Sequence, residues 1–152
     1  MKKIQFMLTL LIFSALTAGC SSDDVPSKFL EDRQHLFQAF FAFNEANKIS
    51  HVPEGIESYN PSPGIEEKAQ AFIEKGLKEG EAISDEFLDW LHPDMRMFFR
   101  GKYMLGHRLI FEGRKEDNVI KQVTGMQLVE EWYHYFWDKN VDAIYRKAYP
   151  KG

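Results

Sequence analysis

The sequence has almost no cysteine: its 152 residues include one, Cys20, near the amino terminus. A single cysteine excludes an intramolecular disulfide, so the chain beyond it depends on its own hydrophobic core for stability. A segment of about 130 residues can bury enough apolar surface for that purpose. We therefore expect one domain that folds without covalent cross-links.

Motifs that mark a catalytic centre are also missing. The chain contains no Gly-x-Ser-x-Gly motif, no glycine-rich phosphate-binding loop and no His-Glu-x-x-His zinc motif. The serines that follow Cys20 fall at connectors and predicted helix starts, where capping and turn formation explain them. An enzyme is therefore the less favoured class, although Glu130 could still meet His107 or His134 in the fold and form a hydrolytic site.

Basic residues are also fewer than acidic ones. Lysine and arginine number 19 against 23 acidic residues, which gives a formal net charge of −4 at pH 7. Proteins that bind nucleic acid usually neutralise phosphates with an excess of basic side chains. This balance disfavours a nucleic-acid partner.

Long apolar runs are limited to one, at residues 4–16, directly after Lys2 and Lys3. Thirteen residues span roughly 20 Å as a helix, which is short of the ~30 Å hydrocarbon core of a bilayer. Small residues at positions 17–19 then lead into Cys20. The residues LTAGC resemble the signal of bacterial lipoproteins, except that the leucine usual three residues before the cysteine lies one position earlier, at Leu16.

The resemblance implies that residues 1–19 are a signal peptide that is removed, and that the thiol and amino group of Cys20 are acylated. Loss of the two lysines would leave 17 basic against 23 acidic residues, a charge of −6. Residues 20–26 would form the lipidated cysteine and a short tether, and residues 27–152 the folded domain. The alternative is an ordinary secretory signal followed by an incidental cysteine.

The resemblance also implies where the protein works. In enterobacterial lipoproteins, a residue other than aspartate after the cysteine directs the protein to the outer membrane, and here that residue is Ser21. The expected location is therefore the periplasmic face of the outer membrane. In a Gram-positive host it would be the surface of the cytoplasmic membrane.

Hydrophobic periodicity after residue 26 predicts an all-α fold, a single compact bundle of five or six helices. Ser27 and Ser84 are predicted N-caps, Gly80 a C-cap, and His92–Pro93 a helix break. A long connector is expected at residues 50–64. The predicted helices cover residues 28–48, 63–80, 85–91, 93–114, 118–139 and 141–149.

The segment 93–114 is apolar on two sides, one containing Leu105 and the other Met97, which places it in the middle of the bundle. Two of its glycines, Gly101 and Gly106, predict close packing at both points. The segment 118–139 is predicted to be its main packing partner. The apolar face expected on that partner comprises Met126, Val129, Trp132, Tyr133, Phe136 and Trp137.

A cationic stripe is expected on the segment 93–114. At 100° per residue its members fall within about 60° of one another; they are Arg96, Arg100, Tyr103, His107 and Arg114. One interpretation is a site for a small anionic ligand or for an acidic segment of a partner, because arginine matches carboxylates and phosphates. The other is structural: Glu130 pairs with one arginine and solvent covers the rest.

A metal centre is not predicted. Glu131 and His134 have the Glu-x-x-His spacing of helical di-iron proteins, but such centres need that motif twice. The related pair Asp32 and His35 lies on a predicted solvated face. No cofactor is expected.

These features favour non-catalytic binding of another envelope protein, as pilotins, exclusion lipoproteins and immunity proteins do. The alternatives are a carrier or sensor of a small anion, using the stripe with Arg96, Arg100 and His107, and an envelope hydrolase. An exposed apolar patch larger than a few hundred Å² would favour the first.

Overall fold

The computed structural model describes residues 25–49 and 63–149. Cys20, the signal-like segment and most of the expected connector at residues 50–64 lie outside these ranges. Within them the chain is an all-α bundle without strands, as predicted. Its elements are η2 (Ser27–Phe29), α2 (Leu30–Ile49), α3 (Pro63–Ala82), α4 (Asp85–Leu91), α5 (Met95–Phe98), η3 (Phe99–Met104), α6 (Leu105–Lys115), α7 (Val119–Tyr133), η4 (His134–Asn140) and α8 (Val141–Ala148).

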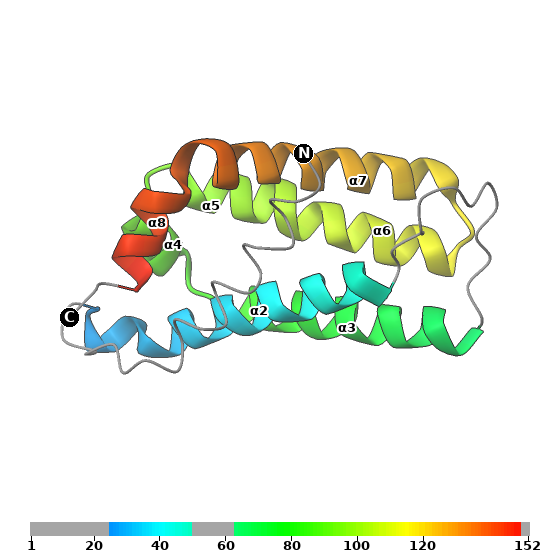
Figure 1. Cartoon of the computed structure of the whole chain (residues 1–152), viewed down its shortest axis with the longest axis horizontal. Helices are drawn as coiled ribbons and strands as arrows, with labels where there is room; N and C mark the ends of the chain where they lie inside the picture. The colour runs from blue at the N-terminus through cyan, green and yellow to red at the C-terminus, as the bar shows by residue number, and fades with distance from the viewer. Residues whose placement is uncertain (1–24, 50–62, 150–152) are drawn as a thin grey trace.

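The long helices form two antiparallel pairs. Helix α2 packs along α3, and α6 packs along α7 (Figure 1). The short helices α4 and α8 lie at the end of the bundle where α2 begins; we call this the tether end. At the opposite end, the far end, α3 begins, α6 finishes and α7 begins.

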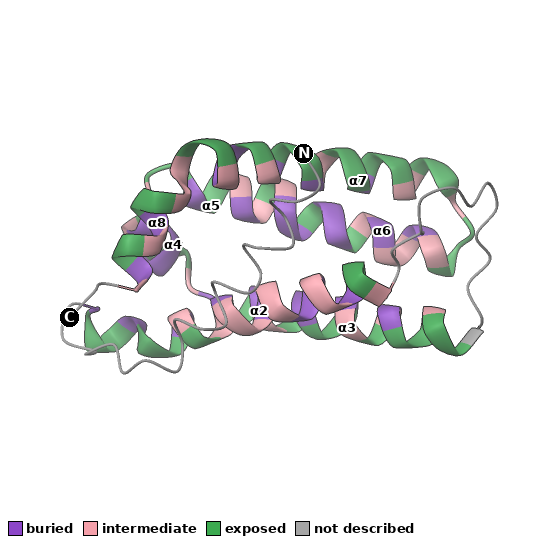
Figure 2. Cartoon of the chain, viewed as in Figure 1, coloured by how far each residue is buried: buried purple, intermediate pink, exposed green. Residues whose placement is uncertain are grey.

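Aromatic side chains fill the space between the two pairs. Phe43 of α2 is fully buried and packs against Gly76, where an added Cβ would lie 2.7 Å from the ring. Trp132 of α7 is 1% exposed, and its ring lies 6.1 Å from that of Phe40. Buried residues face inward along each long helix in Figure 2. The core is therefore one contiguous cluster that reaches from α2 to α8.

Several helix ends follow the sequence, and two do not. The Ser84 hydroxyl accepts the Phe87 N–H at 3.2 Å and caps α4, and α4 ends at His92 in extended conformation, both as predicted. Ser27, a predicted cap, instead lies inside the 3-10 turn that begins after Pro26. Gly80 does not stop α3; it is buried under Met104, and the helix continues to Ala82.

The central helix contains a π-helical turn. It runs without a break from α5 through η3 into α6, and the Leu105 N–H donates to the Arg100 carbonyl, five residues back. One extra residue in the turn rotates everything after it by about 100° relative to an ideal helix. A second π-helical segment, η4, follows α7.

Three apolar side chains that were expected in the core are exposed. Leu105 and Met97 were assigned to apolar sectors of the central helix, yet they are 42% and 61% exposed. Met126, assigned to the packing face of the next helix, is 52% exposed. Those three assignments were wrong.

Close backbone contact joins α6 to α7 at Gly106, as predicted. The prediction of close packing at Gly101 was wrong. A Cβ on Gly106 would lie 2.7 Å from the Gly125 carbonyl oxygen, and one on Gly125 would lie 2.5 Å from the Gly106 oxygen. Neither Gly106 nor Gly125 therefore has room for a side chain. Gly101 is exposed, with nothing within 4 Å of the Cβ position.

The folded part begins before residue 27. Val25 is 4% exposed and belongs to the core cluster with Phe29. Val25, which was expected to belong to the tether at residues 20–26, is therefore part of the folded domain.

Candidate functional site

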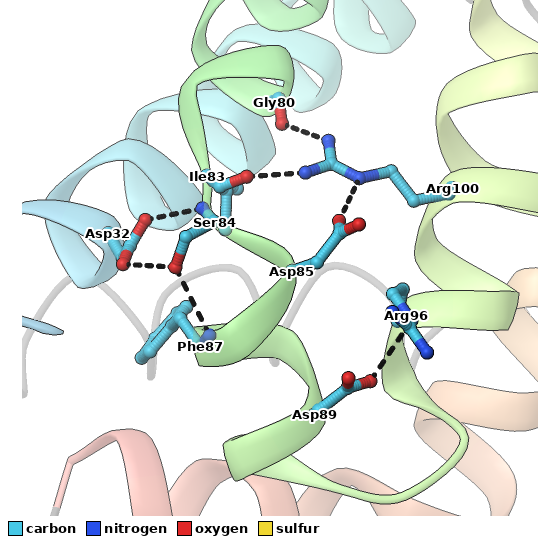
Figure 3. Close-up of polar contacts among 9 residues, drawn as sticks. All are labelled: Asp32, Gly80, Ile83, Ser84, Asp85, Phe87, Asp89, Arg96 and Arg100. Carbon is cyan, nitrogen blue, oxygen red and sulfur yellow. Dashed lines mark hydrogen bonds and ion pairs between the residues drawn. The ribbon is translucent and has the colours of Figure 1, made fainter.

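Arg100 closes the corner between α3 and α4. Its Nη1 donates to the Gly80 carbonyl at 2.7 Å, its Nη2 donates to the Ile83 carbonyl, and its Nε lies 3.1 Å from Asp85 Oδ1 (Figure 3). The carbonyls at the end of a helix have no intrahelical partner, and a cation satisfies them well. All three nitrogens of the guanidinium thus have acceptors within the protein.

Arg96 points to the same short helix. Its Nε lies 3.2 Å from Asp89 Oδ1, and both side chains are about half exposed, at 53% and 42%. Figure 3 shows Arg96 and Arg100 each facing a carboxylate of α4. The expected partner on α7, Glu130, is not the one they use.

Asp32 secures the other side of this corner. It accepts the Ser84 backbone N–H at 2.6 Å and the Ser84 hydroxyl at 2.7 Å. Asp32 is 9% exposed, so its assignment to a solvated face was wrong. The sequence carried no signal for this contact, because it joins residues 52 positions apart.

His107 is enclosed by the core. Its ring stacks on Phe43 with the centroids 3.8 Å apart and meets the edge of Tyr103 at 4.8 Å. Burial, and to a smaller extent the charge of Arg114, lowers the pKa of His107 to about 3. Its Nε2 is buried and has no hydrogen-bond partner among residues 25–49 and 63–149. His107 is therefore a neutral ring at neutral pH and adds no charge to a cationic stripe.

Arg114 lies one to two turns further along α6. It is partly buried; burial lowers its pKa, and the negative charge of Glu66 opposes that shift. The π-helical turn, which contains Arg100, separates Arg96 from His107 and Arg114. Arg96 and Arg100 thus pair with carboxylates of α4, His107 is buried in the core, and Arg114 is partly buried. The structure does not bring the four residues together as one open stripe.

The acidic motif on α7 is dispersed as well. Glu131 pairs with Lys102 at 2.6 Å, and His134 Nδ1 lies 2.7 Å from Asp138 Oδ2 at the surface. Glu130 is exposed and does not converge with the buried His107. In the described ranges there is no group of three or more potential metal ligands. None of the described helices is both long and apolar enough to cross a bilayer.

An exposed apolar surface on α7 is the feature that sequence reasoning missed. The four side chains that form it are 65%, 80%, 46% and 52% exposed; they are Val119, Ile120, Val123 and Met126, and we call them the apolar strip. Spacings of three and four residues place them on one face of the helix. This spacing can be recognised in the sequence, but it does not indicate which side of α7 faces the core.

No protein-family model matches the chain, and no curated protein or solved structure matches it significantly.

Proposed function

We propose that this protein is a membrane-anchored envelope lipoprotein that acts by binding another envelope protein, without catalysis, through the apolar strip on α7. The apolar strip carries the proposal. Contiguous exposed apolar side chains are uncommon on monomeric proteins and often mark interaction sites. The residues LTAGC around Cys20 support the lipid anchor.

The size of the apolar strip indicates what kind of interface it would serve. Fully burying one such side chain contributes about 1.5–3 kcal/mol, and these four are already partly covered. Their burial would therefore contribute a few kcal/mol, which is the central part of a stable interface and not the whole of one. A groove that takes one face of a helix is the partner surface that fits best.

The position of the apolar strip also suits such a role. Its four residues occupy the first half of α7, at the far end of the bundle. Cys20 precedes α2 in the sequence, and α2 begins at the opposite end of the described structure. An anchored molecule would present the strip away from its point of attachment.

In-cell photo-crosslinking tests the proposal. We expect p-benzoylphenylalanine at Val123 of the full chain to give one defined crosslinked product in the native envelope, and the same probe at the exposed Lys75 of α3 to give none. Ile120→Asp should abolish the product without changing the amount of protein. Identical patterns at the two positions would refute binding through the apolar strip, and a product of twice the chain's mass would show self-association instead.

The anchor is tested separately. Cys20→Ala should release the protein from membranes, because the thiol is the expected site of lipid attachment. A Cys20→Ala variant that stays with the membrane fraction would exclude lipidation as the means of attachment.

A further inference from the structure

The chain enters the folded domain very close to its expected lipid. Val25 is buried at the start of the structure, and Cys20 precedes it by five residues. Five residues reach at most roughly 17 Å when fully extended. If Cys20 is lipidated, as the proposed function assumes, the tether end of the bundle is held at the membrane surface.

The side chains at the tether end are of the kinds that favour a membrane interface. Lys147 Nζ lies 4.9 Å from the centroid of the Trp90 ring, and Arg33 Cζ lies 5.7 Å from that of Tyr149. Trp90 and Tyr149 are only partly buried. Such rings combine an apolar body with a polar edge, and the cations above them carry long apolar stems.

Apolar and positive groups extend this surface. Leu30, in the first turn of α2, is 37% exposed, and Arg146 and Lys147 are exposed in the last turn of α8. The nearby carboxylates of α4 are engaged: Glu86 pairs with Lys28, and Asp89 pairs with Arg96.

From this placement we infer that the tether end is a membrane-docking surface, which rests in the phospholipid headgroup region of the bilayer that holds the lipid on Cys20. Tryptophan and tyrosine concentrate at that depth, and lysine and arginine are attracted to anionic headgroups. The surface is built from α2, α4 and the end of α8 and comprises Leu30, Arg33, Trp90, Arg146, Lys147 and Tyr149.

Docking fixes the orientation of the molecule as well as its location. The long helices run from the tether end to the far end. With the tether end on the headgroups, the start of α7 points away from the bilayer. The apolar strip is then available to a partner and does not lie against lipid.

The single cysteine allows a direct test. The mature chain can be coupled through Cys20 to a maleimide lipid in vesicles of phosphatidylethanolamine and phosphatidylglycerol. A photo-crosslinker at Tyr145 of α8 should give several-fold more lipid adduct than one at Val123 of α7. Because a short tether alone would favour Tyr145, the same pair is measured with a long glycine–serine linker inserted between Asp24 and Val25.

With the long linker, a surface that binds headgroups keeps the preference for Tyr145. Arg146→Glu with Lys147→Glu should then reduce the Tyr145 adduct several-fold. The same change of charge on α3, Lys75→Glu with Lys78→Glu, should leave it unchanged. Loss of the preference with the long linker, or equal effects of the two double variants, would overturn the inference.

The outcome is independent of the proposed function. Chemical coupling replaces cellular lipidation, so the vesicle result holds whether or not the cell modifies Cys20. Conversely, release of Cys20→Ala from membranes together with failure of the tether end to dock would overturn only this inference.

Discussion

The tether end and the far end of the bundle are held together in different ways. At the tether end, side chains reach across gaps: Asp32 binds Ser84, and Arg100 binds the last carbonyls of α3. Towards the far end, backbones touch directly, with Gly106 against Gly125. Long side chains can exchange partners, whereas touching backbones leave no freedom to adjust. A rigid helix pair therefore carries the apolar strip, and a preorganised face loses less entropy on binding.

The largest expected effect comes from filling the backbone contact between α6 and α7. Gly125→Ala places a methyl group 2.5 Å from the Gly106 oxygen, so the helices must separate. We expect a loss of more than about 3 kcal/mol in the free energy of unfolding, measured by urea denaturation. Gly101→Ala, at an open helical position, should stabilise by about 0.5–1 kcal/mol. Equal effects at the two glycines would remove the contrast between the ends.

Acid should weaken the core between the two ends. The pKa of His107 is about 3 in the fold against 6.5 for an unperturbed histidine, so the unfolded chain binds a proton that the folded chain refuses. Stability should therefore fall with pH below about 6.5, by about 3 kcal/mol between pH 7 and pH 4 from this residue. His107→Leu should flatten that part of the pH profile of unfolding, and His134→Ala should not. An unchanged profile in His107→Leu would show that the ring titrates normally.

Breaking a side-chain contact at the tether end should cost less. Asp32→Ala leaves the Ser84 N–H without its acceptor, and we expect a loss of about 2 kcal/mol. Glu31→Ala removes the neighbouring carboxylate, which is exposed, and should change stability by less than about 0.5 kcal/mol. Thermal unfolding of the two variants measures the difference. If both behave alike, the Asp32 contact does not hold the corner.

The smallest effects separate the two arginines of the corner. Arg100→Met removes the donors to the carbonyls of Gly80 and Ile83 and should lower the free energy of unfolding by about 1 kcal/mol. Arg96→Met removes one half-exposed ion pair and should cost about 0.3 kcal/mol or less. Chemical denaturation in low and high salt would check both values. A larger loss for Arg96 than for Arg100 would contradict the capping role.

Local signals in the sequence were sufficient to predict most of the fold. Ser84 caps α4 as predicted, and His92–Pro93 ends α4 as predicted. Helix α7 begins at Val119, one residue after the predicted start at Asn118, which caps it. A cap or a helix break involves only residues that are close to it in the sequence, so the local sequence is enough to predict it. Gly80 was misread because a glycine can serve close packing as well as termination, and only its contact with Met104 distinguishes the two.

The candidate site could not be predicted in the same way. The stripe assumes an ideal helix, and the π-helical turn at Phe99–Met104 rotates His107 and Arg114 relative to Arg96. The pairing of Arg100 depends on where α4 lies, which is a property of the whole bundle. The apolar strip depends likewise on which face of α7 meets α6. Tertiary contact, not local pattern, decides each of these points.

The tight connection between α6 and α7 has a consequence for how the chain folds. Three residues join the helices, and Asp117 among them adopts a left-handed conformation with φ of 52°. Contacts between segments so close in sequence form quickly, because little loop entropy is lost in closing them. We expect the α6–α7 hairpin to be largely formed in the folding transition state and α2 to dock on it later. Folding kinetics of Val129→Ala and Leu36→Ala would show this order as a high φ-value for the first and a low one for the second.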